Sequence, residues 1–177
     1  MRPVILYITS SLDGFIAEPD GGMGWLDEAS AAGTDFGYAE FYASIDTMLM
    51  GGATYEFLLG AAEGFPHADR EVFVFTQRDL PAAAPSVTLV AADAATFTAR
   101  LRETEGGRIW LVGGGQINAA LLGADLIDEL RLFVQPVLLG DGVPLFAAPG
   151  ARLNLALDSV TEWPRGVVEL RYQRAGE

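Results

Sequence analysis

The sequence predicts an α/β protein with a mixed, mostly parallel sheet and helices on both faces. Short apolar runs typical of buried strands alternate with segments of helical periodicity, which is the pattern of α/β folds. At two places a strand-like run leads into glycines and then into a helix, and open α/β sheets bind ligands at such strand ends. The last two strand-like segments, 153–161 and 167–172, follow each other closely and predict an antiparallel C-terminal hairpin.

Composition limits the domain organisation and the partners. A chain of 177 residues, 50% of them hydrophobic, fits one domain with a sizeable core, so we expect a single domain over residues 1–177. No apolar run reaches the roughly 18 residues of a membrane helix, and the N-terminal segment lacks the features of a signal peptide, so we expect a cytoplasmic protein. A formal net charge of −13 argues against nucleic acids and anionic membranes as partners.

The inventory of reactive residues argues against several kinds of catalysis. The chain has no Cys and a single His, which argues against a zinc site, and it has no Lys for Schiff-base chemistry. The one histidine, His67, follows a proline in a loop and is expected to be solvent-exposed. Carboxylates, Tyr and water remain for acid–base work, which suits a reaction whose difficult step belongs to a cofactor.

The first segments in order are two strands and a loop. Residues 4–9 form an apolar run typical of a strand buried on both faces, and residues 15–17 predict a second, short strand. The following loop, 18–25, is rich in glycine but carries Met23 and Trp25. Such a loop is typical of a lid over a site, although an ordinary surface loop anchored by Trp25 fits equally well.

A helix and the first strand–glycine–helix junction come next. Residues 35–45 predict a helix that Asp35 caps, because four apolar side chains share one face at helical spacing: Tyr38, Phe41, Tyr42 and Ile45. Residues 48–50 predict a buried strand. It leads into Gly51 and Gly52 and then into a helix that we expect to end at Leu59, with Gly60 after it.

The second half of the chain continues the alternation. It predicts strands at 72–75, 87–90, 108–112 and 130–134, helices at 93–105 and 116–122, and a loop at 136–146. The strand at 72–75 ends in Thr76, Gln77 and Arg78, polar residues placed where a parallel strand would meet a ligand.

The glycine run Gly113, Gly114 and Gly115 is the centre of the second junction. Glycines permit close approach of a ligand, and the helix that follows offers unpaired N–H groups and a positive dipole end to an anion. Neither common phosphate motif is matched, because Asn118 stands where the dinucleotide fingerprint has its third glycine and no Lys follows. A phosphate seat and a tight structural turn both remain open.

Four segments, in this order, resemble the dihydrofolate-reductase-like superfamily, and in particular the reductase domain of the bacterial riboflavin-biosynthesis deaminase/reductase. They are Ser11–Ala17, Met50–Glu56, Val112–Gly115 and Pro136–Phe146. The resemblance implies a three-layer fold with an eight-stranded sheet, and a homodimer. It also implies NADPH as cofactor, with NADH possible, and hydride transfer to a C=N bond of a pterin or a pyrimidine ribosylamine, a small heterocyclic substrate.

The resemblance also implies roles for individual residues. Cofactor contacts fall on Ala17, Gly51, Gly52, Thr54, Val112, Gly113, Gly114, Gly115, Gln116 and Ile117, and the polar triplet Thr76, Gln77 and Arg78 adds to them. Ile16 and Ala17 would border the nicotinamide, and Met23 and Trp25 belong to the lid. Many relatives hold the 2′-phosphate of NADPH with an Arg at the position of Gly52. Arg78 could replace it, so the choice between NADPH and NADH stays open.

The catalytic carboxylate has two candidates. Asp35 lies at about the spacing of the substrate-binding carboxylate of dihydrofolate reductases, and burial among Phe36, Tyr38 and Trp25 would favour its protonated form. Glu40, on the same helix, is the alternative. Asp35 could equally serve only as a helix cap. Two further interpretations remain: a non-catalytic nucleotide-binding protein, and a flavin-dependent one, on the same fold.

Overall fold

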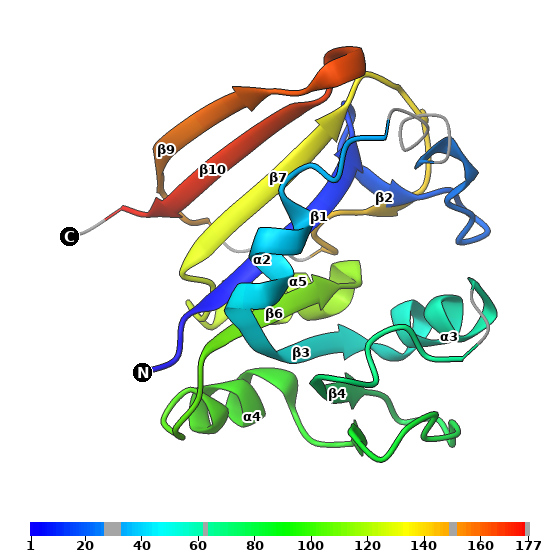
Figure 1. The fold of residues 1–177 in the computed structure, drawn as a ribbon, viewed down its shortest axis with the longest axis vertical. Helices are drawn as coiled ribbons and strands as arrows, with labels where there is room; N and C mark the ends of the chain where they lie inside the picture. The colour runs from blue at the N-terminus through cyan, green and yellow to red at the C-terminus, as the bar shows by residue number, and fades with distance from the viewer. Residues whose placement is uncertain (27–32, 62–63, 149–151, 176–177) are drawn as a thin grey trace.

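The computed structural model describes residues 1–26, 33–61, 64–148 and 152–175. An eight-stranded sheet forms its centre, in the order β5-β4-β3-β6-β1-β7-β10-β9 (Figure 1). In that order the strands are Val87–Val90, Glu71–Phe75, Ile45–Gly51, Arg108–Gly113, Val4–Ser11, Glu129–Gln135, Val168–Arg174 and Leu155–Glu162. The strands from β5 to β7 run parallel, whereas β10 runs antiparallel to β7 and β9. The predicted mixed sheet and C-terminal hairpin are confirmed.

Helices cover both faces of the sheet, because successive side chains of its buried strands point to opposite sides. The α-helices are α2 (Tyr38–Ser44), α3 (Gly52–Ala61), α4 (Ala94–Leu101) and α5 (Gly115–Gly123). Phe41 of α2 and Tyr55 of α3 pack on one face with Met48 and Met50, while Leu121 of α5 packs on the other face with Leu49. This arrangement gives the expected three layers. None of the described helices is long and apolar enough to cross a membrane.

Several predicted element boundaries are wrong. Helix α2 begins at Tyr38 rather than at Asp35, because Gly37, with a φ of 72°, turns the chain just before it. Ile45, predicted on the helix face, is instead the first residue of β3. Helix α3 continues past Gly60, and α4 ends at Leu101 rather than near residue 105.

The segment predicted as a plain loop at 136–146 contains a short strand. Its β8 (Val143–Pro144) pairs antiparallel with β2 (Phe15–Ala17) in a separate two-stranded sheet. The loop after β2 ends in a 3-10 turn at Gly24–Leu26, and a second such turn at Pro164–Gly166 joins β9 to β10. The β2–β8 pair therefore connects the loop that carries Met23 and Trp25 to the carboxyl ends of the central strands.

Candidate functional site

A cavity of about 710 Å³ lies at the carboxyl ends of β3, β4 and β6. The two predicted strand–glycine–helix junctions meet there, since Met50 pairs with Gly113 across β3 and β6. The hydroxyl of Thr54 donates a hydrogen bond to the Gly113 carbonyl at 3.3 Å, which ties the start of α3 to the second junction. The walls are formed by Gly51, Gly52, Ala53, Thr54, Phe75, Thr76, Gln77, Arg78, Val90, Ala92, Ala94, Gly114, Gly115, Gln116, Ile117, Ala120, Val143, Pro144 and Ala147.

The glycine turn at the start of α5 leaves no room for side chains. Gly114 has a φ of 98°, a conformation that favours glycine, and a Cβ on Gly115 would lie 2.4 Å from the Pro144 carbonyl oxygen. No side chain caps this helix end. Because the first N–H groups of a helix have no partner within it, α5 offers donors and a positive dipole end where Gly115, Gln116 and Ile117 line the cavity.

Among the described residues of the cavity wall, Arg78 carries the one charged side chain. Its backbone N–H donates to the Thr76 hydroxyl at 3.0 Å, which turns the chain after β4 toward the start of α3. A Cβ on Gly52 would lie 3.0 Å from Nη2 of Arg78. The guanidinium therefore lies beside the position where the resemblance leads us to expect an arginine, and it forms an ion pair there with Glu56 at 2.7 Å.

Most of the residues predicted to bind the cofactor lie on the cavity wall. They are Gly51, Gly52, Thr54, Thr76, Gln77, Arg78, Gly114, Gly115, Gln116 and Ile117. Val112 and Gly113 precede them on β6 without forming part of the wall. Ala17 does not line the cavity but lies on the strand next to it, since it pairs with Val143 of β8, which does. Met23 and Trp25 are half-buried in the loop after β2 and are also absent from the wall.

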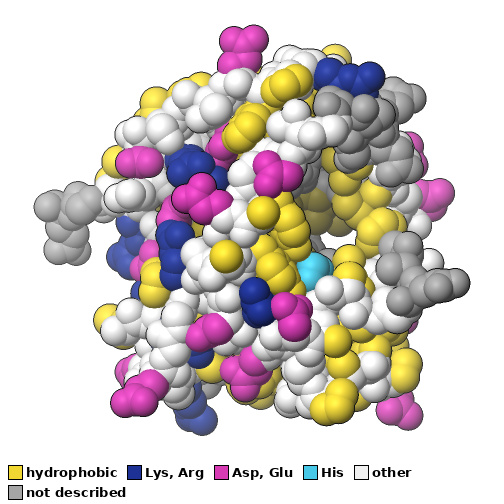
Figure 2. Space-filling model, viewed as in Figure 1, with side chains coloured by type: hydrophobic (Ala, Val, Ile, Leu, Met, Phe, Trp, Pro, Cys, Tyr) yellow, Lys and Arg dark blue, Asp and Glu magenta, His cyan; other side chains and the backbone are white. Residues whose placement is uncertain are grey.

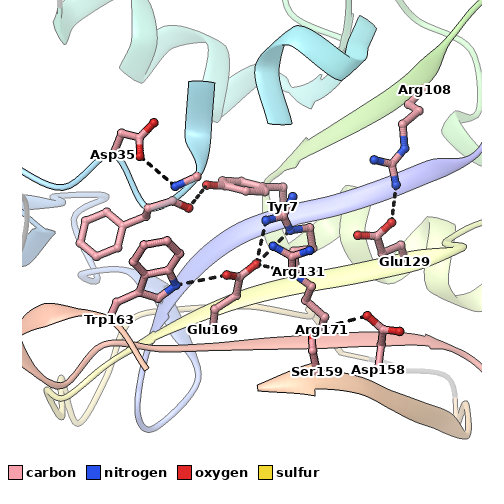
Figure 3. Close-up of polar contacts among 12 residues, drawn as sticks. Tyr7, Asp35, Arg108, Glu129, Arg131, Asp158, Ser159, Trp163, Glu169 and Arg171 are labelled. Atoms are coloured by element: carbon pink, nitrogen blue, oxygen red, sulfur yellow. Dashed lines mark hydrogen bonds and ion pairs between the residues drawn. The ribbon is translucent and has the colours of Figure 1, made fainter. Parts of the chain in front are cut away.

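The expected burial of Asp35 is wrong. Its side chain is exposed, and its carboxylate accepts a hydrogen bond from the Gly37 N–H at 3.0 Å (Figure 3). It also accepts one from the Ala39 N–H at 3.3 Å. This geometry matches the helix-capping interpretation, because the carboxylate satisfies donors at the start of α2. Glu40 is exposed as well, and neither carboxylate lines the cavity.

The expected exposure of His67 is also wrong, because the side chain is half-buried among aromatic rings. Figure 2 shows this single histidine within a hollow of the surface, next to hydrophobic side chains. Its ring lies 5.7 Å from that of Trp110, 5.6 Å from that of Tyr42 and 5.9 Å from that of Phe65. Tyr38 also packs edge-on against Trp110 at 5.9 Å. Sequence reasoning missed this cluster, since its members come from three distant segments.

Hydrogen bonds orient the histidine in this aromatic hollow, which we define by Tyr38, Tyr42, His67 and Trp110. The Tyr42 hydroxyl donates to Oδ1 of Asp69 at 2.6 Å and lies 3.4 Å from Nδ1 of His67. Burial lowers the pKa of His67, an effect that Asp69 only partly opposes, so the neutral imidazole is favoured. Burial, together with the hydrogen bond to Asp69, raises the pKa of Tyr42. Tyr42 therefore stays a donor to Asp69.

A buried charge cluster joins β7 and β10 (Figure 3). Glu169 is 0% exposed and accepts hydrogen bonds from Arg131 at 2.8 Å, from Arg171 at 2.7 Å and from the Trp163 indole at 3.1 Å. Burial alone would raise the pKa of Glu169, but these hydrogen bonds outweigh it and hold the pKa below its usual range. The Arg131 guanidinium in turn lies over the Tyr7 ring, 5.1 Å from its centre. These contacts hold β10 to β7 and bring Arg131 of β7 against Tyr7 of β1.

Several residues of the cavity wall were not anticipated. Phe75, Val90, Ala92 and Ala94 come from the ends of β4 and β5 and the start of α4. Val143 and Pro144 come from β8, within a segment whose glycines and prolines predicted only a loop. The resemblance had included Pro144 among its matching residues, but it gave that position no role.

The sheet order, the glycine turn and the cavity at the strand ends define a domain of the dihydrofolate-reductase-like class. Within this class, the chain belongs to the RibD C-terminal domain family, whose family model matches residues 65–169. The uncharacterized protein YwjB of Bacillus subtilis is 38% identical over 174 residues, which cover 98% of this chain and 99% of the relative. The predicted superfamily and its riboflavin deaminase/reductase branch are thus confirmed.

Solved structures agree with this assignment. A protein from Shewanella sp. PV-4, described as a riboflavin biosynthesis protein with that role unproven, superimposes with a TM-score of 0.87 at 28% identity, over 98% of this chain and 99% of that one. Dihydrofolate reductase from Enterococcus faecalis, complexed with NADP(H), superimposes with a TM-score of 0.67 at 15% identity, over 98% and 97% of the two chains. The second similarity shows a shared fold.

Proposed function

We propose that this chain is a single-domain NAD(P)H-dependent reductase that transfers hydride to a C=N bond of a pterin or a pyrimidine ribosylamine. The observation that carries the proposal is the cavity of about 710 Å³ at the meeting point of two glycine turns. Its size lies within the roughly 300–1,000 Å³ of ordinary ligand and cofactor sites. The NADP(H) complex of the dihydrofolate reductase with the same fold supports the choice of cofactor.

The residues present fit a dinucleotide. The N–H groups at the start of α5 suit a diphosphate, and the absence of any side chain at Gly114 and Gly115 lets it approach the backbone. Gly51 and Thr54, from the first glycine turn, would contact the cofactor from the side of α3. Arg78 would face the ribose end, because it follows β4 and its guanidinium lies beside Gly52 at the start of α3, whereas the diphosphate would lie at the start of α5. When bound, the reduced nicotinamide supplies the hydride.

The aromatic hollow is the place that we propose for the substrate ring. Trp110 lies on β6 three positions before Gly113, so the hollow is close to the glycine turn along the same strand. Aromatic side chains stack well on flat heterocycles, and the neutral His67 offers a hydrogen-bond acceptor to a ring N–H. Ile16, Ala17, Met23 and Trp25 would enclose the reacting atoms from the side of β2.

The source of the proton is Asp35 or Glu40 in this proposal. Both are exposed at or near the start of α2, so either would act as an ordinary surface carboxylate, or through water. Asp35→Asn and Glu40→Gln should each be compared with wild type for turnover of pterin and pyrimidine ribosylamine test substrates. If neither variant alters turnover, the proton comes from another group or from water, and this assignment is wrong.

The central experiment is calorimetric titration with NADPH and with NADH at fixed salt. Ala120→Trp places a large ring in the cavity from an exposed position on α5 and should abolish binding of both nucleotides. Ala99→Trp is the matched control, because Ala99 is exposed on α4 away from the cavity wall, and it should bind as wild type does. Failure of wild type to bind either nucleotide would contradict the reductase proposal.

A non-catalytic nucleotide-binding protein is the second candidate. The described residues of the cavity wall include no carboxylate, His or Tyr that could transfer a proton. This candidate predicts nucleotide binding without oxidation of NADPH by any test substrate. A yellow protein on purification would instead indicate a flavin in the same cavity.

We also propose that two copies associate through β9. This edge strand exposes Leu155, Leu157 and Val160, at 39%, 56% and 56% of their surface, and its outer backbone groups have no neighbouring strand within the described sheet. Light scattering after size-exclusion chromatography should give the mass of a dimer for wild type and of a monomer for Leu157→Lys. Leu12→Lys, at another exposed position, should leave the mass unchanged.

A further inference from the structure

The contact that leads beyond the proposed cofactor site is the ion pair between Arg78 and Glu56. Nη2 of Arg78 and Oε2 of Glu56 are 2.7 Å apart, and the two side chains are 55% and 41% exposed. Glu56 lies four positions after Gly52 on α3, one helical turn from the glycine that the guanidinium contacts. The one charged side chain on the described cavity wall is therefore already partnered by Glu56, a carboxylate of α3 that does not itself line the cavity.

This pairing bears directly on the choice between the two nicotinamide nucleotides. NADPH differs from NADH only by a phosphate on the adenosine ribose, and an arginine recognises that phosphate by charge-assisted, paired hydrogen bonds. A phosphate that approaches Arg78 meets Glu56 at the same guanidinium. It must displace the carboxylate or share the arginine with a negative charge at short range. The ribose hydroxyl of NADH, in contrast, can donate a hydrogen bond to Glu56.

We propose that Glu56 is a specificity-determining residue, an internal counterion that offsets the attraction of Arg78 for a ribose phosphate and keeps the preference for NADPH over NADH small. The inference rests on the proposed nicotinamide-dependent function. On this inference, Arg78 contacts the position of Gly52 but does not fully replace the arginine that the resemblance leads us to expect there.

Only charges close to Arg78 should influence how strongly it binds a ribose phosphate. An exposed ion pair is weak, so a phosphate can separate Arg78 from Glu56. The net charge of −13 repels every anion, but charges more than about 10 Å away are largely screened at ordinary salt concentrations. Asp79 follows Arg78 in the sequence and has an exposed side chain, so it provides a neighbouring carboxylate that is not paired with the guanidinium.

The test is a double-mutant cycle on the full chain, with dissociation constants for NADPH and NADH measured by calorimetry. We expect Glu56→Gln to tighten NADPH binding by about three- to tenfold and to leave NADH within about twofold. Arg78→Gln should weaken NADPH binding by about tenfold or more without weakening NADH. In the Arg78→Gln background, Glu56→Gln should tighten NADPH binding clearly less, because the carboxylate then has no arginine to neutralise and only its screened repulsion of the phosphate remains.

Asp79→Asn is the matched control, because it removes one negative charge next to the pair without breaking it. Its effects on the affinities for NADPH and for NADH should both be smaller than the effect of Glu56→Gln on the affinity for NADPH. Equal changes for NADPH and NADH, or the same Glu56→Gln effect with and without Arg78, would overturn the inference while leaving the reductase proposal intact. Absence of binding of both nucleotides in wild type and in all variants would instead overturn the reductase proposal, and this inference with it.

Discussion

Gly115 is the residue whose identity the cavity constrains most tightly. A Cβ there would lie 2.4 Å from the carbonyl oxygen of Pro144, a backbone atom that cannot move without displacing β8. We expect Gly115→Ala to lower the free energy of unfolding by about 1–3 kcal/mol, the usual cost of overpacking, and to weaken nucleotide binding.

Gly60→Ala provides the control for Gly115→Ala. Gly60 lies within α3, and a Cβ at this position would have no other atom within 4 Å, so alanine should raise the free energy of unfolding by about 0.5–1 kcal/mol. Urea denaturation measures both variants. Equal effects of the two substitutions would show that the close approach of Gly115 to Pro144 is not maintained.

His67 gives the molecule a sensitivity to mild acid. Burial lowers its pKa below the ordinary value of 6.5, so the unfolded chain binds more protons than the folded one just below that pH. The contribution of His67 to stability is therefore complete above pH about 6.5 and is lost as the pH falls toward the lowered pKa. Between pH about 7 and pH about 5, wild type should lose more thermal stability than His67→Gln. Parallel losses would contradict the burial of this ring.

At the scale of single elements, Asp93 shows how a local signal determines a helix end. Its carboxylate accepts the Thr96 N–H at 2.8 Å and caps α4, as the sequence predicted. We expect Asp93→Ala to cost about 1 kcal/mol of stability and Asp93→Asn much less, because asparagine caps about as well. Thermal denaturation at neutral pH measures the difference, and a similar loss in both variants would argue against the cap.

Elements that depend on local pattern were predicted well. Strands β2 and β5 have the predicted bounds, since apolar runs flanked by turn residues determine them. Ile45 was assigned to the wrong element because an apolar residue fits a helix face and a buried strand equally well. The two-residue strand β8 could not be predicted, because it exists only through its pairing with β2.

The same distinction between local and distant signals applies to the candidate site. The glycine turns and the polar end of β4 were visible because each is a contiguous segment, and the structure brings them to one cavity. The exposure of Asp35 and the burial of His67 were not, because both depend on neighbours from distant segments. The ion pair of Arg78 with Glu56 likewise joins two separate segments, the bend after β4 and helix α3.

At the scale of the whole molecule, the buried charge cluster around Glu169 holds the C-terminal hairpin to the rest of the sheet. Removing the carboxylate leaves two arginines without their shared partner, so Glu169→Gln should cost about 3–5 kcal/mol. Because the pKa of Glu169 is lowered from 4.5, its contribution is present above pH about 4.5 and is lost as the pH falls through the lowered value.

Glu162→Gln, at an exposed position of β9, is the control for the Glu169 substitution and should change stability by no more than about 0.5 kcal/mol. Guanidinium denaturation at pH about 7 and pH about 4 measures both variants. The gap between wild type and Glu169→Gln should narrow at the lower pH. A gap independent of pH would show that the charge of Glu169 does not stabilise the fold.

The strand order has a consequence for how the chain acquires its structure. β1 lies in the middle of the sheet, where Val4 pairs with Ile109 and Ile5 with Glu129. During synthesis, β1 therefore leaves the ribosome long before β6 and β7 have been made. Its apolar residues cannot be buried in the sheet until then. Chains dominated by such distant pairings fold in milliseconds to seconds rather than microseconds. Until β6 and β7 have been synthesised, the apolar residues of β1 therefore stay exposed to other chains, and aggregation competes with folding during this interval.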